Sequence, residues 1–103
     1  MPDKPWKRHE RIIAQRLGGV RAGPTGRNGP DVLHNYLAVQ CKERKSLPDW
    51  LTAAMAQAVG DAGEGQLPLV ILHTAGARHD DDLVVVRLAD WEAWYGAVQH
   101  PEP

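Results

Sequence analysis

Residues 29–42, GPDVLHNYLAVQCK, decide the fold that we expect for this chain. Two short apolar runs, centred near Val32 and Val39, flank the pair Asn35-Tyr36, and this pattern predicts a β-hairpin that turns at the pair. The turn is imperfect, because a two-residue turn usually has Gly second. In this register Val32 faces Val39 across the hairpin.

The same register gathers three polar side chains at the open end of the hairpin. Asp31 faces Gln40, and Lys42 lies two residues further along the second strand. Because directly opposed residues and residues two apart share one face of a sheet, all three side chains are expected on one side. Considered alone, Asp31 is explained as an ordinary turn residue, and Gln40 and Lys42 are explained as the exposed polar face of a strand. The side chains expected on the other side, in the core, are those of Val32, Val39 and Cys41.

A helix is expected over residues 6–17, with Pro5 in its first turn and Gly18-Gly19 ending it. At 100° per residue, Glu10 falls in the middle of the apolar stripe of this helix, where an unpaired carboxylate is costly. Glu10 therefore needs a cation. The alternatives are a buried salt bridge to one basic side chain, or a shifted helix from which Glu10 reaches solvent.

The rest of the chain predicts a small α/β fold, an α+β arrangement with one mixed sheet. Ser46 is expected to cap a second helix with Asp49 in its first turn, and Asp90 to cap a short final helix. The second helix suggests a right-handed βαβ crossover. The other segments are a strand at 20–22, a breaker-rich loop at 23–30, the second helix at 47–60 and strands at 67–73 and 83–88.

Length and composition predict a single domain over 1–103, with its core at about 6–96 and a flexible tail at 97–103. The lone Cys41 excludes an intrachain disulfide and a thiolate zinc site, and it fits a reducing compartment. No run of 18 apolar residues and no leader pattern is present, so we expect a soluble, cytoplasmic protein with no membrane partner.

Charge is unevenly distributed along the chain. Residues 1–50 carry ten Lys and Arg and five Asp and Glu, a charge of +5, whereas residues 51–103 carry two and eight, a charge of −6. A basic half can attract a phosphate backbone although the whole chain has a charge of −1. Chance segregation in a small protein is the alternative.

Segment 29–31 (Gly-Pro-Asp), followed nine residues on by segment 40–42 (Gln-Cys-Lys) and preceded by Glu10 on a helix, resembles the PD-(D/E)xK nuclease superfamily. The order of elements is similar to the αβββαβ restriction-endonuclease-like core of that family, over roughly residues 6–96. One departure is Gln40, where most members have Glu or Asp. Certain type IV restriction enzymes are similar in carrying Gln there.

The resemblance implies a set of roles for the hairpin and the first helix. Asp31 would bind Mg²⁺ or Mn²⁺ directly, with the side-chain oxygen of Gln40 and the backbone carbonyl of Cys41 as further ligands. Hard oxygen ligands suit these ions. Lys42 would orient or activate the attacking water, and Glu10 would hold a metal-bound water or a second ion.

The small size is most similar to Holliday-junction resolvases and their phage-encoded relatives, which act as homodimers. The resemblance therefore implies a homodimer acting on DNA, including branched DNA. Eight side chains are DNA-binding candidates, about half of them equally well explained as ordinary solvated residues, with Arg27 at the loop tip the strongest. These candidates are Lys7, Arg8, Arg11, Arg21, Arg27, Arg44, Lys45 and Gln57.

A second group of residues invites a metal-site interpretation. His73, His79 and the acidic run 80–82 lie close in sequence, but a solvated acidic turn is the favoured interpretation. His9 and His34 are expected at the surface.

The sequence thus predicts a Mg²⁺-dependent DNA endonuclease that hydrolyses phosphodiester bonds in branched or distorted DNA. The first alternative is a catalytically inactive nucleic-acid-binding domain of the same fold. The second is a protein-interaction module with no nucleic-acid role.

Overall fold

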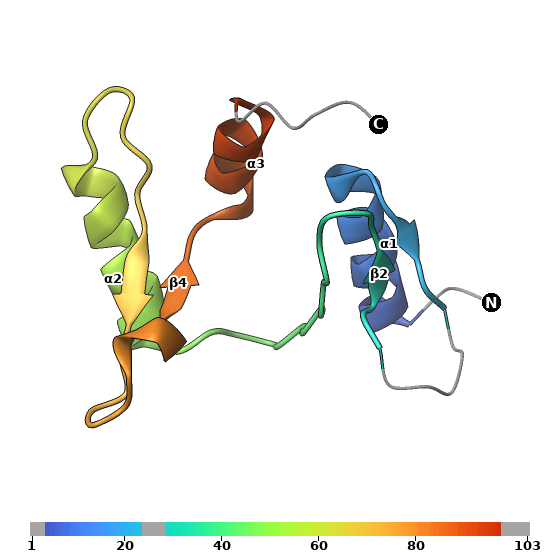
Figure 1. The fold of residues 1–103 in the computed structure, drawn as a ribbon, viewed down its shortest axis with the longest axis horizontal. Helices are drawn as coiled ribbons and strands as arrows, with labels where there is room; N and C mark the ends of the chain where they lie inside the picture. The colour runs from blue at the N-terminus through green and yellow to red at the C-terminus, as the bar shows by residue number, and fades with distance from the viewer. Residues whose placement is uncertain (1–3, 24–28, 98–103) are drawn as a thin grey trace. The chain divides into compact units, whose positions relative to one another are not determined.

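The structure is a computed structural model that describes residues 4–23 and 29–97. It is an α+β chain that divides into two compact units, Met1–Lys45 and Ser46–Pro103. Figure 1 colours the first unit from blue to green and the second from green to red. The elements are α1 (Pro5–Leu17), β1 (Val20–Arg21), β2 (Val32–Leu33), α2 (Asp49–Asp61), β3 (Val70–Leu72), the 3₁₀-helix η1 (His79–Asp81), β4 (Leu83–Val85) and α3 (Leu88–Ala97).

Helix α1 has the bounds that its sequence predicts. Pro5 is its first residue, where the missing N–H of proline is no loss because that position has no intrahelical acceptor. The helix ends at Gly18, which adopts a left-handed conformation with φ 76°. The N–H of Gly19 then donates to the carbonyl of Ala14 at 2.9 Å. This left-handed turn reverses the chain into β1.

The first unit contains an antiparallel two-stranded sheet in which Val20 pairs with Leu33 and Arg21 with Val32. An isolated antiparallel bridge joins Val32 to Val39, which confirms the predicted pairing of these two residues, whereas the backbone N–H of Asp31 bonds to Val39 and not to Gln40. The second strand of that hairpin is reduced to this one bridge. Residues 40–48 form neither helix nor strand, because their side chains are mostly polar and exposed and have no apolar face to bury.

The core of the first unit is small and lies where α1 packs on β1 and β2. Val32 is completely buried, and Ala14 is 3% exposed. The absence of a side chain at Gly19 lets the chain after α1 lie close to β2. A Cβ at this position would lie 2.5 Å from the carbonyl oxygen of Leu33 and 2.8 Å from Cγ1 of Val32. A side chain at position 19 would therefore push the helix end away from β2.

The second unit holds a second antiparallel pair, β3 with β4, on which α2 packs through β3. Two separate two-stranded sheets, β1–β2 and β3–β4, thus stand where the sequence predicted one mixed sheet. In this unit β3 and β4 are neighbours in both sequence and space, and a short connection suffices for an antiparallel pair.

Two predicted helix caps are wrong. Helix α2 begins at Asp49 after Pro48, and no side chain caps it, so Ser46 is not its cap. The fixed backbone of Pro48 supplies the turn into the helix in place of a side-chain acceptor. Helix α3 begins two residues before Asp90, whose carboxylate accepts a 2.7 Å hydrogen bond from Nε of Arg87.

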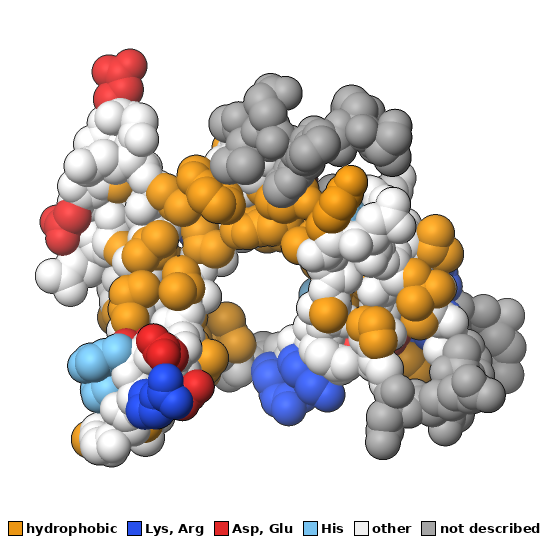
Figure 2. Space-filling view, in the orientation of Figure 1, with side chains coloured by type: hydrophobic (Ala, Val, Ile, Leu, Met, Phe, Trp, Pro, Cys, Tyr) orange, Lys and Arg blue, Asp and Glu red, His pale blue; other side chains and the backbone are white. Residues whose placement is uncertain are grey.

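Two-stranded sheets bury little apolar surface, and several large apolar side chains stay exposed. They include Val20 and Leu33 in the first unit and Trp50 and Leu83 in the second. Figure 2 shows apolar side chains over much of the face that it presents. No helix within the described ranges has the length and apolarity needed to cross a membrane.

Candidate active site

Glu10 is the buried charged residue of the described chain, at 8% exposure. Its position on the inner side of α1 confirms the predicted placement on the apolar stripe. Nε of Arg21, on β1, lies 3.6 Å from Oε1 of Glu10. That Nε is itself buried and makes no hydrogen bond. The cation beside Glu10 in this structure is therefore a basic side chain, one of the alternatives left open by the sequence.

Asp31 is held at three points. Its backbone N–H donates to the carbonyl of Val39 at 2.6 Å, and its own carbonyl accepts from the N–H of Ala22 at 3.0 Å. Its side-chain Oδ2 accepts a 2.5 Å hydrogen bond from the backbone N–H of Cys41. The carboxylate therefore bonds to the backbone beside Gln40, the residue that the predicted register places opposite it.

Gln40 and Lys42 are both exposed, on either side of Cys41. Nε2 of Gln40 donates to the carbonyl of Gly29 at 2.7 Å. A carbonyl can only accept, so the amide nitrogen faces Gly29 and the amide oxygen keeps its capacity to bind a cation. Lys42 has no ion pair with any described residue.

The electrostatics of Cys41 place both carboxylates near one point. Burial raises the pKa of its thiol above the ordinary value, and the negative charges of Asp31 and, to a smaller extent, Glu10 raise it further. The charges that disfavour a thiolate at this position would favour a bound cation. The donor set of carboxylate, amide and carbonyl oxygens also fits the preference of Mg²⁺ and Mn²⁺.

The basic candidates on the first helix and strand differ in their surroundings. Arg8 and Arg11 are exposed on α1, whereas Lys7 is half-buried with its Nζ 5.4 Å from the Trp6 ring centroid. Arg21 is also half-buried, and its guanidinium carbon lies 5.8 Å from the same ring. Arg8 and Arg11 are thus the two most exposed side chains of this group.

The remaining DNA-binding candidates follow the hairpin or lie elsewhere. Arg44 and Lys45 are exposed in the segment after the hairpin, and Nη1 of Arg44 donates to the carbonyl of Glu43 at 3.2 Å. Gln57 is exposed on α2 in the second unit. Arg27 lies outside the described residues.

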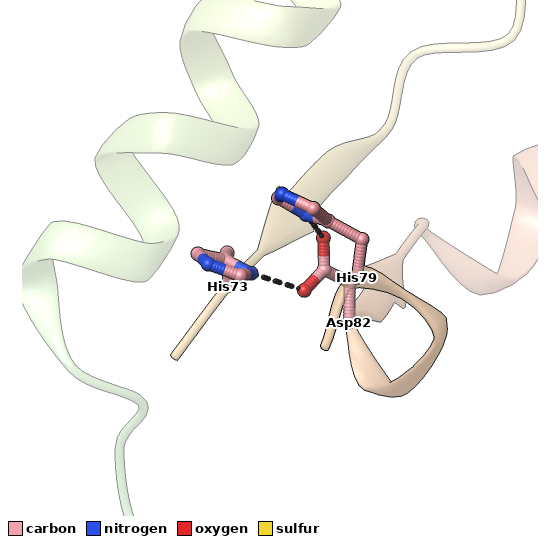
Figure 3. A group of neighbouring side chains, drawn as sticks. All are labelled: His73, His79 and Asp82. Atoms are coloured by element: carbon pink, nitrogen blue, oxygen red, sulfur yellow. Dashed lines mark hydrogen bonds and ion pairs between the residues drawn. The ribbon is translucent and has the colours of Figure 1, made fainter. Parts of the chain in front are cut away.

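The second unit brings together part of the group for which the sequence favoured a solvated acidic turn over a metal site. The side chains of His73, His79 and Asp82 converge, with one donor atom of each within 4.8 Å of the others (Figure 3). The interpretation of this stretch as a solvated acidic turn is therefore incomplete. The signal that points to the group is the pairing of residues 70–72 with 83–85, which places His73 opposite Asp82.

The described residues thus hold two polar centres, one around Asp31 in the first unit and one around Asp82 in the second. Only the second has three His, Cys, Asp or Glu donor atoms already close together within the described ranges. Comparison with protein-family models, with curated proteins and with solved structures gives no match.

Proposed function

We propose that this chain is a metal-dependent DNA endonuclease of the PD-(D/E)xK type, with Glu10, Asp31, Gln40 and Lys42 as its active residues. The observation that carries the proposal is the Val32–Val39 bridge, extended by the hydrogen bond from Cys41 to Asp31. These contacts support a hairpin whose open end groups the Pro-Asp segment with the Gln-Cys-Lys segment. We also propose that the chain has the αβββαβ restriction-endonuclease-like core of that family.

In the proposed mechanism three oxygen atoms of the hairpin would hold one Mg²⁺ or Mn²⁺ ion. They come from the Asp31 carboxylate, the Gln40 amide and the Cys41 carbonyl. Such an ion supplies Lewis acidity toward the scissile phosphate and lowers the pKa of a water. Oδ2 of Asp31 already accepts from the Cys41 N–H, so Oδ1 would be the oxygen that binds the ion.

Two further side chains complete the proposed chemistry. The exposed ammonium of Lys42 orients the attacking water and offsets the negative charge that develops on the phosphorus centre. Glu10 adds negative charge from within the first unit, where its carboxylate also forms an ion pair with Arg21. The ion pair with Arg21 offsets the cost of burying the Glu10 carboxylate, since an unpaired buried carboxylate would be costly.

The proposed substrate is DNA, including branched DNA. The basic first half of the chain supports contact with a phosphate backbone, and Arg8, Arg11, Arg44 and Lys45 are exposed there. Resolving a four-way junction requires two symmetric cuts. A two-fold homodimer supplies two identical sites and is part of the proposal.

The test is cleavage of four-way junction, duplex and single-stranded DNA by purified protein in Mg²⁺, Mn²⁺ or EDTA. We expect cutting with either ion and none in EDTA. Asp31→Asn should abolish it, and Lys42→Ala should slow it by at least about 100-fold, as loss of a positioned acid–base group does. Asp61→Asn, on α2, is the matched control and should cut normally. Wild-type rates from folded Asp31→Asn or Lys42→Ala would refute this active site.

The second candidate is a catalytically inactive DNA-binding domain of the same fold. Two observations favour it: the Glu10 carboxylate is already paired with Arg21, and Gln40 is neutral where most related sites carry a carboxylate. Fluorescence anisotropy with the same DNAs separates the two candidates. Salt-sensitive binding without cleavage in either ion would support the inactive domain.

A further inference from the structure

The β3–β4 pair places two metal-ligating side chains opposite each other. Leu72 pairs with Leu83 at the last position of the ladder, so His73 and Asp82 are the next opposed positions. Directly opposed residues share a face of the sheet. Their side chains therefore meet where the two strands open into the connecting loop.

His79 reaches the same point from the loop itself. It is the first residue of η1, and Asp82 follows directly after that 3₁₀-helix. In a 3₁₀-helix, residues three apart eclipse each other, so His79 lies over Asp82. The strand register and the helical turn thus act independently to bring two imidazoles to one carboxylate.

The contacts at Asp82 are short and two-sided. Oδ1 lies 2.6 Å from Nδ1 of His73, and Oδ2 lies 3.1 Å from Nδ1 of His79. The two imidazole rings are stacked, with centroids 4.2 Å apart and planes 21° apart. Figure 3 shows both rings turned toward the carboxylate, each meeting a different oxygen.

We propose that His73, His79 and Asp82 bind a divalent transition-metal ion, with Zn²⁺ as the representative ion. Ligands about 2.1 Å from one ion are separated by roughly 3.0 Å in an octahedral site and 3.4 Å in a tetrahedral one. The N···O separations at Asp82 are close to those values, whereas the three donor atoms together lie within 4.8 Å of one another and would have to draw closer by side-chain rotation. Without an ion, the two rings donate Nδ1–H to the carboxylate. With one, each proton moves to Nε2 and Nδ1 becomes a ligand.

The donor set decides the class of ion. Two imidazole nitrogens and one carboxylate suit Zn²⁺, Co²⁺ or Ni²⁺, whereas Mg²⁺ and Ca²⁺ prefer oxygen ligands. Three protein ligands leave at least one position for water or another molecule. The His79 side chain is 82% exposed, so the ion has an open approach, while the Asp82 side chain is only 15% exposed and anchors the site.

The neighbouring loop adds negative charge. Asp80 and Asp81 are exposed and lie next to the ligands His79 and Asp82 in the sequence. Asp80 forms a 2.8 Å ion pair with Arg78. All three ligands belong to the second unit, so this site is separate from the proposed Mg²⁺ centre of the first unit. An ion here would join the end of β3, η1 and the start of β4.

The test is titration of the full chain, without an affinity tag, with ZnCl₂ while imidazole ¹⁵N chemical shifts are recorded. We expect the signals of His73 and His79 to move together and to stop at one equivalent. His9 and His34 lie in the first unit and should not follow them. MgCl₂ at the same concentration should leave all four unchanged. Unmoved His73 and His79 signals at one equivalent of Zn²⁺ would overturn the proposal.

Matched variants separate a ligand from a nearby charge. Asp82→Asn and Asp81→Asn remove the same charge one residue apart, and only Asp82→Asn should weaken Zn²⁺ binding by calorimetry, by at least about tenfold. His79→Ala keeps the fold testable if Asp82→Asn does not fold, because His79 is exposed. Its Zn²⁺ affinity should fall by a similar factor. Equal affinities in Asp81→Asn and Asp82→Asn, or a wild-type affinity in His79→Ala, would overturn the proposal.

Discussion

The backbone N–H of Cys41 donates a 2.5 Å hydrogen bond to Oδ2 of Asp31, across a gap of ten residues. This bond joins the two halves of the candidate motif, because Lys42 follows Cys41 directly. An asparagine at position 31 can accept the same bond through its amide oxygen. Asp31→Asn therefore removes the negative charge while keeping the contact, so a loss of cleavage in that variant would report on charge.

Gln40→Glu should lower the Mg²⁺ concentration that gives half-maximal cleavage. The change adds one negative charge at nearly constant volume, and a unit charge about 4 Å from a divalent ion contributes about 2 kcal/mol in high dielectric, or roughly thirtyfold. Glutamate cannot donate the bond that Gln40 makes to the carbonyl of Gly29, which opposes part of this gain. The measurement is initial cleavage rate against Mg²⁺ concentration.

Gln15→Glu, an exposed change on α1, is the matched control for Gln40→Glu and should leave the titration in place. Tighter metal dependence with slower cutting would keep Gln40 in the site, with the added charge repelling the scissile phosphate. A titration and a rate that both match the wild type would remove Gln40 from the site.

Cys41 is the chain's one cysteine. The pH dependence of its alkylation reports the electrostatic potential around it and requires no nuclease activity. Because burial and the charges of Asp31 and Glu10 raise its pKa, iodoacetamide should react with it only at higher pH than with an ordinary thiol. Asp31→Asn should move the midpoint of alkylation rate to lower pH, since one of those charges is gone. Mg²⁺ at the proposed site should move it the same way.

The pH profile of alkylation, followed by mass spectrometry, gives these midpoints. Asp81→Asn removes a carboxylate of the second unit and is the control. A midpoint that Asp31→Asn leaves unchanged would contradict the electrostatic coupling between Asp31 and the thiol. A midpoint that Mg²⁺ leaves unchanged would count against metal binding beside Cys41.

Gly19→Ala should destabilise the protein. The added Cβ would meet the Leu33 carbonyl oxygen at 2.5 Å and Cγ1 of Val32 at 2.8 Å, both in the packed contact of α1 with β2. Overpacking of this kind costs about 1–3 kcal/mol of the free energy of unfolding. Urea denaturation followed by circular dichroism measures the change.

Gly60→Ala is the matched control for the glycine substitution. Gly60 lies within α2, and nothing is within 4 Å of a Cβ at that position. Alanine there should stabilise the protein by about 0.5–1 kcal/mol, because it lowers the conformational entropy of the unfolded chain. A Gly19→Ala protein as stable as the wild type would show that α1 and β2 are not packed as closely as described.

The chain should form homodimers at micromolar concentration. Two symmetric cuts on a junction require two active sites, which a two-fold dimer supplies. Exposed apolar residues such as Val20 and Leu33 are available for burial in a dimer interface. Sedimentation equilibrium with and without junction DNA measures the mass. A monomer under both conditions would contradict this part of the proposal.

The elements that sequence alone predicted best are those whose ends are fixed by backbone chemistry. Pro5 and Gly18 mark α1 because one lacks an N–H and the other accepts a positive φ. The Val32–Val39 pairing followed from placing the hairpin turn at Asn35-Tyr36, and the bridge confirms it. Such local rules act within a few residues and need no knowledge of the rest of the fold.

Long-range pairing was beyond the sequence. The alternation through Gln40 and Lys42 suggested a continuing strand, but a strand requires a partner with free backbone groups, and none pairs with them among the described residues. The Ser46 cap failed for a related reason, since a serine near a helix start is a cap only if the helix begins one residue later. Pro48 moved that start to Asp49.

The convergence of His73 with Asp82 depends on the register of β3 against β4. In the sequence, His73 and Asp82 are nine residues apart and are typical of solvated loop residues. A ladder that pairs Leu72 with Leu83 makes them neighbours, and a slip of one residue would turn one of them to the other face. Register is the information that the sequence alone did not supply.

The boundary between Lys45 and Ser46 has a consequence for how this protein can be taken apart. The candidate ligands around Asp31 all precede this boundary, and the three around Asp82 all follow it. A cut at the boundary would therefore separate the two groups without dividing either. A protease that cuts at this boundary should therefore give two fragments, each of which carries the complete set of candidate ligands of one centre.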